Sequence, residues 1–205
     1  MRQLKEIDFM NSAKLLEVEP EVIKAVARVE AQRGGFTQDG RPIILFEGHV
    51  FHKFLKYKGL DVDSLVQEYP SIVYPKWTKK YYLGYDSKRI MTSRIDDEYE
   101  RLAIAQTIDN ESALKSCSWG KFQIMGFNFK KCNYDTVFDF VYDMQKSERE
   151  HLIAFCNFII NRGLKKYLQE KNWTKFAYYY NGESYYKNNY DLLLGNAYWH
   201  YKRYS

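Results

Sequence analysis

The chain has 205 residues, a formal net charge of +5 and a pI near 8.9, and 45% of its residues are hydrophobic and 18% aromatic. This length suits one domain, or one domain with small lobes. The composition is too apolar for a disordered protein, and the sequence has no run of about 18 apolar residues that would cross a membrane. The positive charge fits either a mildly basic soluble protein or one that prefers an anionic polymer.

Neither the N-terminal residues nor the cysteines predict an exported, disulfide-bonded protein. The N-terminal residues carry acids and lack a continuous apolar core before a small-residue cleavage site, so they do not form a secretory signal peptide. Cys117, Cys132 and Cys156 are odd in number and widely spaced, which predicts neither a disulfide framework nor a metal site. We therefore expect reduced thiols in a protein made in the cytoplasm.

The first part of the chain predicts helices around one short β segment. Apolar residues recur at helical spacing through Val22, Val26 and Val29, and Gly34-Gly35 ends this helix. Asp-Gly marks a turn before the β segment. The expected elements are a helix over 8–16, a helix from Pro20 to Glu30, a turn over 37–42, a β segment over 43–46 and a helix over 47–56.

The second part also predicts mostly helix. Ser147 and Glu150 have the spacing of a capping box, which opens the clearest helix of the chain. The expected elements are an irregular, tyrosine-rich region over 59–95, a helix over 96–108, a tightly packed helical segment from Ser112 that ends at Trp119-Gly120, a mixed apolar stretch over 121–126, a helix that starts after Ser147 and stops at Gly163, a helix over 174–180 and a last helix over 191–204. The fold class is mostly α (α+β), with a small β excursion near residues 37–46.

Five motifs, taken in order, make the sequence similar to a known family. They are VEAQRGGF, DGRPIILFEGHVF, YPSIVYP, ALKSCSWGKFQIMGFN and AYYYNG. With these motifs the chain resembles the phage muramidase-type endolysins (N-acetylmuramidase domain) of the lysozyme-like superfamily, from about Leu15 to Tyr201. The resemblance implies a two-lobed, lysozyme-like fold that forms a single catalytic domain over residues 1–205 without a separate wall-binding domain. It also implies hydrolysis of the β-1,4 bond between N-acetylmuramic acid and N-acetylglucosamine in bacterial peptidoglycan.

The same resemblance implies roles for individual residues. In that superfamily the proton donor is a glutamate that closes the first long helix of the catalytic domain, and Glu30 occupies this position. The segments that line the sugar groove in related lytic enzymes fall here on Ser118, Gly120, Gln123, Ile124, Met125, Tyr180 and Asn181. The implied protein is a monomer without a cofactor. It reaches the cell wall after holin-type release or by a dedicated export machine.

The chemistry of glycoside hydrolysis points to Glu30 independently of the resemblance. The reaction needs a carboxylic acid that stays protonated near neutral pH. Glu30 follows Val26 and Val29, so partial burial is expected to raise its pKa from an ordinary value of about 4.3. The second carboxylate would be Glu47, which follows the β segment, or Asp39 in the turn before it.

Other roles remain open for these residues. In the alternative interpretation, Glu30 is a solvated side chain in the last turn of a helix and Asp39 only forms a turn. Glu47 is then a structural partner of Arg41 or His49. Tyr180 and Asn181 would simply end a helix, and Trp119 is expected in the core.

Three other functions are weighed against the muramidase. A lytic transglycosylase would use the same glutamate but form 1,6-anhydro products. A non-catalytic module would bind wall glycan or nucleic acid through the interleaved lysines and tyrosines of residues 76–82, although we expect no nucleic-acid partner and no insertion into a membrane. Glu47, His49 and His52 have a spacing that also occurs in zinc sites, but no further ligand is evident and we expect no metal.

Overall fold

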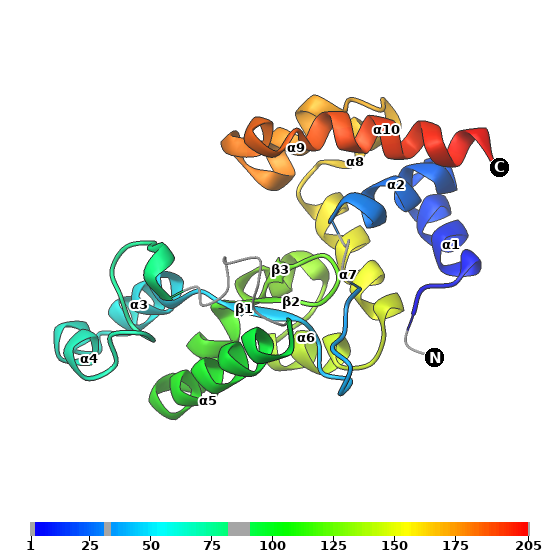
Figure 1. Ribbon diagram of the computed structural model, residues 1–205. Coiled ribbons are helices and arrows are strands. Elements are labelled where there is room, and N and C mark those ends of the chain that lie inside the picture. The colour runs from blue at the N-terminus through cyan, green and yellow to red at the C-terminus, as the bar shows by residue number, and fades with distance from the viewer. Residues whose placement is uncertain (1–2, 31–33, 82–90, 205) are drawn as a thin grey trace.

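The structure of the protein is a computed structural model that describes residues 3–30, 34–81 and 91–204. Figure 1 shows two groups of elements, which we call the helical lobe and the sheet lobe. The helical lobe comprises α1 (Glu6–Leu16), α2 (Pro20–Glu30), α7 (Glu148–Asn161), α8 (Lys165–Gln169), α9 (Trp173–Asn181), the 3-10 helix η3 (Glu183–Asn188) and α10 (Tyr190–Arg203). The sheet lobe comprises β1 (Ile44–Phe46), α3 (Gly48–Tyr57), α4 (Val62–Glu68), η1 (Lys79–Tyr81), α5 (Met91–Lys115), β2 (Cys117–Trp119), β3 (Ile124–Met125), η2 (Gly126–Cys132) and α6 (Val137–Met144).

Helix α2 is the central element of the helical lobe. Pro20 starts it and Glu21 lies in its first turn, as the positive end of a helix favours. Its apolar side chains Ile23 and Val26 are completely buried, because α1 and α10 pack along it. This packing fixes the direction of α2 and therefore the position of its last residue, Glu30.

The sheet lobe contains a small antiparallel sheet with strand order β1-β2-β3. Ile44 pairs with Trp119, and Trp119 pairs in turn with Ile124. Strand β1 confirms the expected β segment at the end of residues 37–46. The loop before it turns as expected, since the backbone N–H of Thr37 donates to the carbonyl of Arg41.

The helix expected up to Trp119 was wrong beyond residue 115. Helix α5 ends at Lys115, and Cys117 to Trp119 form the central strand, buried at all three positions. A strand of three residues is too short to show a period of two, and its neighbours β1 and β3 supply the backbone hydrogen bonds that make it a strand. The sheet therefore extends beyond the expected β excursion and includes the most specific motif of the sequence.

Other predicted helices agree with the structure within a few residues, but three helices were missed, namely α4, α6 and the short α8. Helix α6 carries a buried stripe of Val137, Phe140, Val141 and Met144, and α4 lies in the region expected to be irregular. The helix expected over 96–108 is longer and has a non-helical residue at position 109. The predicted irregular region includes residues 82–90, which lie outside the described residues.

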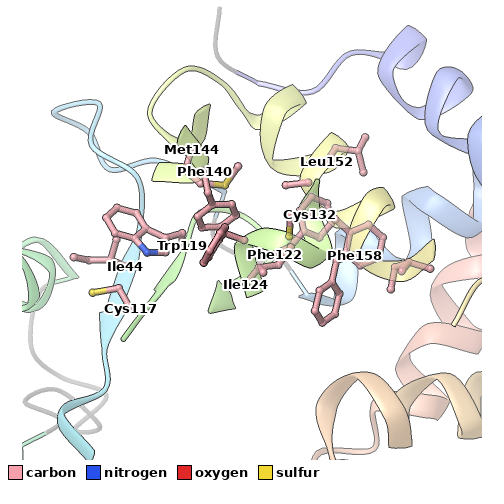
Figure 2. Packing of buried hydrophobic residues seen from close by; sticks show 14 of the residues in the cluster. Ile44, Cys117, Trp119, Phe122, Ile124, Cys132, Phe140, Met144, Leu152 and Phe158 are labelled. Carbon is pink, nitrogen blue, oxygen red and sulfur yellow. The ribbon is translucent and has the colours of Figure 1, made fainter. Parts of the chain in front are cut away.

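The buried apolar side chains connect the sheet to the helices around it. Figure 2 shows Phe122 and Ile124, from the β2–β3 hairpin, among side chains of α6 and α7 such as Phe140 and Phe158. Trp119 is only 2% exposed, and its indole N–H donates to the carbonyl of Leu114 at 3.2 Å. Trp119 is thus a core residue, as expected, and the hairpin is anchored by its packing against α6 and α7.

The state of the cysteines agrees with the reduced thiols expected from the sequence. Cys117, Cys132 and Cys156 are free thiols and all three are buried. Burial raises the pKa of Cys132 to about 12 and that of Cys156 to about 11, so they are poor nucleophiles. Within the described residues, we find no helix that combines the length and the apolarity needed to span a bilayer.

Candidate active site

Glu30 is a partly buried carboxylic acid at the end of α2. Burial raises its pKa from an ordinary 4.5 to about 7, against the opposing effect of one hydrogen bond from Asn181. Desolvation penalises the charged form of a carboxyl group and so keeps the proton on it. At neutral pH a large fraction of Glu30 is therefore a neutral acid that is able to donate a proton.

Two consecutive residues at the end of α9 connect Glu30 to the hairpin. The side-chain amide of Asn181 donates to Glu30 Oε1 at 3.0 Å, and the hydroxyl of Tyr180 donates to the carbonyl of Phe122 at 3.1 Å. The Tyr180 ring stacks on Phe176 with centroids 5.4 Å apart. The helix end that carries Tyr180 and Asn181 thus joins Glu30 to the turn of the hairpin.

One polar atom at this junction has no partner. Asn181 Oδ1 is buried and, among the described residues, no donor reaches it. An unsatisfied buried acceptor typically costs about 1–3 kcal/mol.

The hairpin turn holds its own shape through Gln123. This residue has a positive φ of 48°, and its amide nitrogen donates to the carbonyls of Gly120 at 2.8 Å and Ile43 at 3.2 Å. Its amide oxygen accepts from the hydroxyl of Ser118 at 2.8 Å. Ser118 and Ile124 are buried. Of the residues expected to line the groove, Gln123 is exposed and Met125 is partly exposed.

A buried histidine, which the sequence analysis missed, holds the two sides of the site together. His151 Nδ1 accepts from the backbone N–H of Lys121 at 3.0 Å, and its Nε2 donates to the carbonyl of Met144 at 2.7 Å. Burial lowers its pKa to about 4, so the ring is neutral at neutral pH. Gly35 and Gly120 lie so close to the ring that a Cβ on either would be 2.6 Å from a ring atom.

Glu148 supports the same junction. It is 5% exposed and accepts hydrogen bonds from the backbone N–H groups of Gly35 at 2.7 Å and Leu4 at 3.2 Å. Lys121 Nζ lies 3.3 Å from the same carboxylate. Only the Ser-x-x-Glu start of α7 was visible in the sequence, and nothing there indicated that Glu148 would reach residues more than 100 positions away.

The two candidates for a second carboxylate have different surroundings. Glu47 follows β1, its side chain is 16% exposed, and its Oε2 lies 3.3 Å from His49 Nδ1. Asp39 is 52% exposed, and its carboxylate binds the hydroxyl of Thr37 and the guanidinium of Arg41. These contacts, which lie within its own turn, lower the pKa of Asp39. The contacts of Asp39 are those of a turn former, and the contact of Glu47 with His49 is the structural partnership that the sequence also allowed.

The fold and the site together define the class of the protein. A helical lobe and a small-sheet lobe meet at a glutamic acid whose proton is retained by burial, as in the lysozyme-like glycosidases. A family model described as N-acetylmuramidase matches residues 19–202. The chain therefore belongs to the N-acetylmuramidase family, and it is a peptidoglycan hydrolase of the glycosidase type.

A solved structure agrees with this assignment. The chain is similar to the crystal structure of the Burkholderia AP3 phage endolysin, with 39% sequence identity and a TM-score of 0.87, over 98% of this chain and 73% of that chain. No match was found among curated proteins. The resemblance to phage muramidase-type endolysins and the two-lobed, mostly α fold are thereby confirmed.

Proposed function

We propose that the protein cleaves the β-1,4 bond between N-acetylmuramic acid and N-acetylglucosamine, with Glu30 as the general acid. The observation that carries the proposal is the burial that raises the pKa of Glu30 to about 7. Cleavage of a glycosidic bond needs a proton on the leaving oxygen as the bond breaks, and an acid with a pKa near the working pH transfers it most effectively. The bacterial cell wall is then the place of action, reached by holin-type release or dedicated export.

In this proposal the hairpin and the end of α9 form the walls of the sugar groove. Gln123 and Met125 offer exposed or partly exposed side chains, and Asn181 lies beside the acid, because its amide donates to Glu30. Ser118, Gly120, Ile124 and Tyr180 act mainly by holding this wall in place, because their polar groups bond within it or their side chains are buried.

The direct test of the reaction is the analysis of digested cell wall by mass spectrometry. We expect reducing muramic acid ends, because water attacks the sugar once Glu30 has protonated the leaving oxygen. A lytic transglycosylase would instead give 1,6-anhydromuramic ends, lighter by one water molecule. If all product ends were 1,6-anhydromuramic acid, the enzyme would be a lytic transglycosylase and not a hydrolase. Binding to the wall without any cleavage would exclude both enzymes.

We propose Glu47 as the second carboxylate, which activates water or stabilises the oxocarbenium-like transition state. Glu47→Gln is expected to lower kcat roughly 10²-fold, while Asp39→Asn changes kcat less than about threefold, because the Asp39 carboxylate is engaged in its own turn. Turbidity assays on permeabilised cells measure both rates, and melting curves exclude unfolding. A large loss in Asp39→Asn together with an active Glu47→Gln would reverse the assignment.

A further inference from the structure

A groove runs between α2 and α10 on the helical lobe, beginning at the helix end that carries Glu30. We call it the α2–α10 groove. It is lined by Arg28, Val29, Leu193, Asn196, Ala197 and His200. The two α2 residues immediately precede Glu30, and the four α10 residues recur at i, i+3, i+4 and i+7, which places them on one face. Figure 1 shows α10 lying along α2, with α9 near the start of α10.

The groove has a near end and a far end relative to Glu30. Lys202, close to the end of α10, bonds to Glu19, just before α2 begins, at 2.7 Å. The two helices therefore run antiparallel, and the start of α10 lies at the Glu30 end of α2. His200 follows Leu193 by seven residues, which is about 10 Å along the helix. The groove thus leads away from the acid for about this distance.

The lining combines apolar surface with positive charge. Leu193 supplies exposed apolar surface, to which the largely buried Val29 and Ala197 add little. Among the described residues of the lining there is no carboxylate. Arg28 is exposed, with its guanidinium 5.8 Å from the Tyr201 ring, and no acidic residue of the described chain forms an ion pair with it. Such a surface suits a ligand in which small apolar groups alternate with carboxylates.

The substrate of the proposed reaction carries such a ligand. Muramic acid in peptidoglycan bears, on its lactyl group, a short peptide stem that contains alanines and free carboxylates. Because the bond that Glu30 would protonate belongs to this sugar, the stem must leave the site close to the end of α2. Four extended residues span about 13 Å, which is comparable to the length of about 10 Å between Leu193 and His200.

We propose that the α2–α10 groove binds the anionic peptide stem of peptidoglycan, with the stem's carboxylates at Arg28 and His200 and its alanine methyl groups on the exposed side chain of Leu193. The inference rests on the proposed function, because it places the muramic acid next to Glu30. Binding of the stem in this groove makes the enzyme selective for glycan chains that still carry their stems.

The test compares two substrates and two matched charge reversals. The substrates are intact peptidoglycan and glycan chains from which an amidase has removed the stems. The variants are Arg28→Glu and the control Lys56→Glu, which changes the net charge equally at an exposed position at the end of α3 in the sheet lobe. For Arg28→Glu we expect kcat/KM on intact peptidoglycan to fall about tenfold, mainly through KM, with an unchanged rate on stem-free chains. Lys56→Glu should change neither rate.

A second variant and a binding measurement test the same inference even if the Arg28→Glu variant fails to fold. Asn196→Asp places a carboxylate on the opposite wall of the groove and is expected to show the same selective loss. Calorimetry with a muramoyl tetrapeptide should show binding to the wild type, and weaker binding to both groove variants or when the carboxylates of the peptide are amidated.

The outcomes separate this inference from the proposed function. A wild type that cleaves neither substrate would refute the proposed function itself. Cleavage of both substrates at equal rates, or an equal loss on both in the groove variants, would overturn only the stem site. The groove variants could instead lose binding to anionic lipid vesicles and still cleave stem-bearing wall at the wild-type rate. The groove would then be a membrane-binding surface, and the stem site would be overturned as well.

Discussion

Glu30→Gln is expected to lower the rate of wall lysis about 10³-fold while leaving the fold intact. Glutamine has the same shape and keeps an oxygen for the amide of Asn181, which donates to Glu30 Oε1 at 3.0 Å. It has no proton that it is able to transfer to the leaving oxygen. Turbidity assays and product analysis measure the loss, and the exposed Glu170→Gln on the helical lobe serves as the matched control. Wild-type lysis by Glu30→Gln would refute the assigned acid.

The same variant is expected to be more stable than the wild type at alkaline pH. The folded-state pKa of Glu30 is about 7, raised from 4.5 by burial, so the folded protein holds a proton that the unfolded chain releases between these values. The wild type therefore loses stability as the pH rises from 4.5 through 7, by about 3 kcal/mol in total. Glutamine does not ionise and avoids this loss.

Urea denaturation at pH 5 and pH 8 measures this difference. The free energy of unfolding of Glu30→Gln should exceed that of the wild type by up to about 3 kcal/mol at pH 8 and by much less at pH 5. The rate of lysis by the wild type should fall as the pH rises above about 7, because the general acid loses its proton. A stability difference that does not depend on pH would show that Glu30 is an ordinary solvated carboxylate.

Local patterns in the sequence were sufficient to predict α2 and the position of Glu30. The apolar spacing of Val22, Val26 and Val29 and the following glycines define this helix and its end, and partial burial of Glu30 follows from its neighbours. Helix α6 was equally visible, since Val137, Phe140, Val141 and Met144 have helical spacing, and this stripe was overlooked. By contrast, the three residues of β2 become a strand only because distant segments pair with them.

The support of the site depends on contacts that no local pattern reveals. His151 meets Lys121 and Gly35 across 30 and 116 positions of the sequence, and its role depends on the packing of α7 against the hairpin turn. Gly120 was assigned to the sugar groove by resemblance. In the structure its lack of a side chain has a physical reason, because the His151 ring occupies the space where a Cβ would lie.

Gly120→Ala is therefore expected to destabilise the protein by about 3 kcal/mol and to reduce its activity. A Cβ at this position would lie 2.6 Å from the ring of His151. The ring has no room to yield, because Lys121 and Met144 hold both of its nitrogens. Overpacking of this kind costs about 1–3 kcal/mol, and the positive φ of 67° adds about 1 kcal/mol for a residue with a side chain.

Gly163→Ala separates the two contributions. Gly163 has a φ of 69°, nearly that of Gly120, but apart from its chain neighbours no heavy atom of a described residue lies within 4 Å of the position where its Cβ would be. It should therefore lose only the backbone contribution of about 1 kcal/mol and keep its full activity. Urea denaturation and turbidity assays on both variants measure the difference, which reports the contact with His151. Equal losses in the two variants would mean that the histidine ring moves aside, and that the two sides of the site are not held rigidly through it.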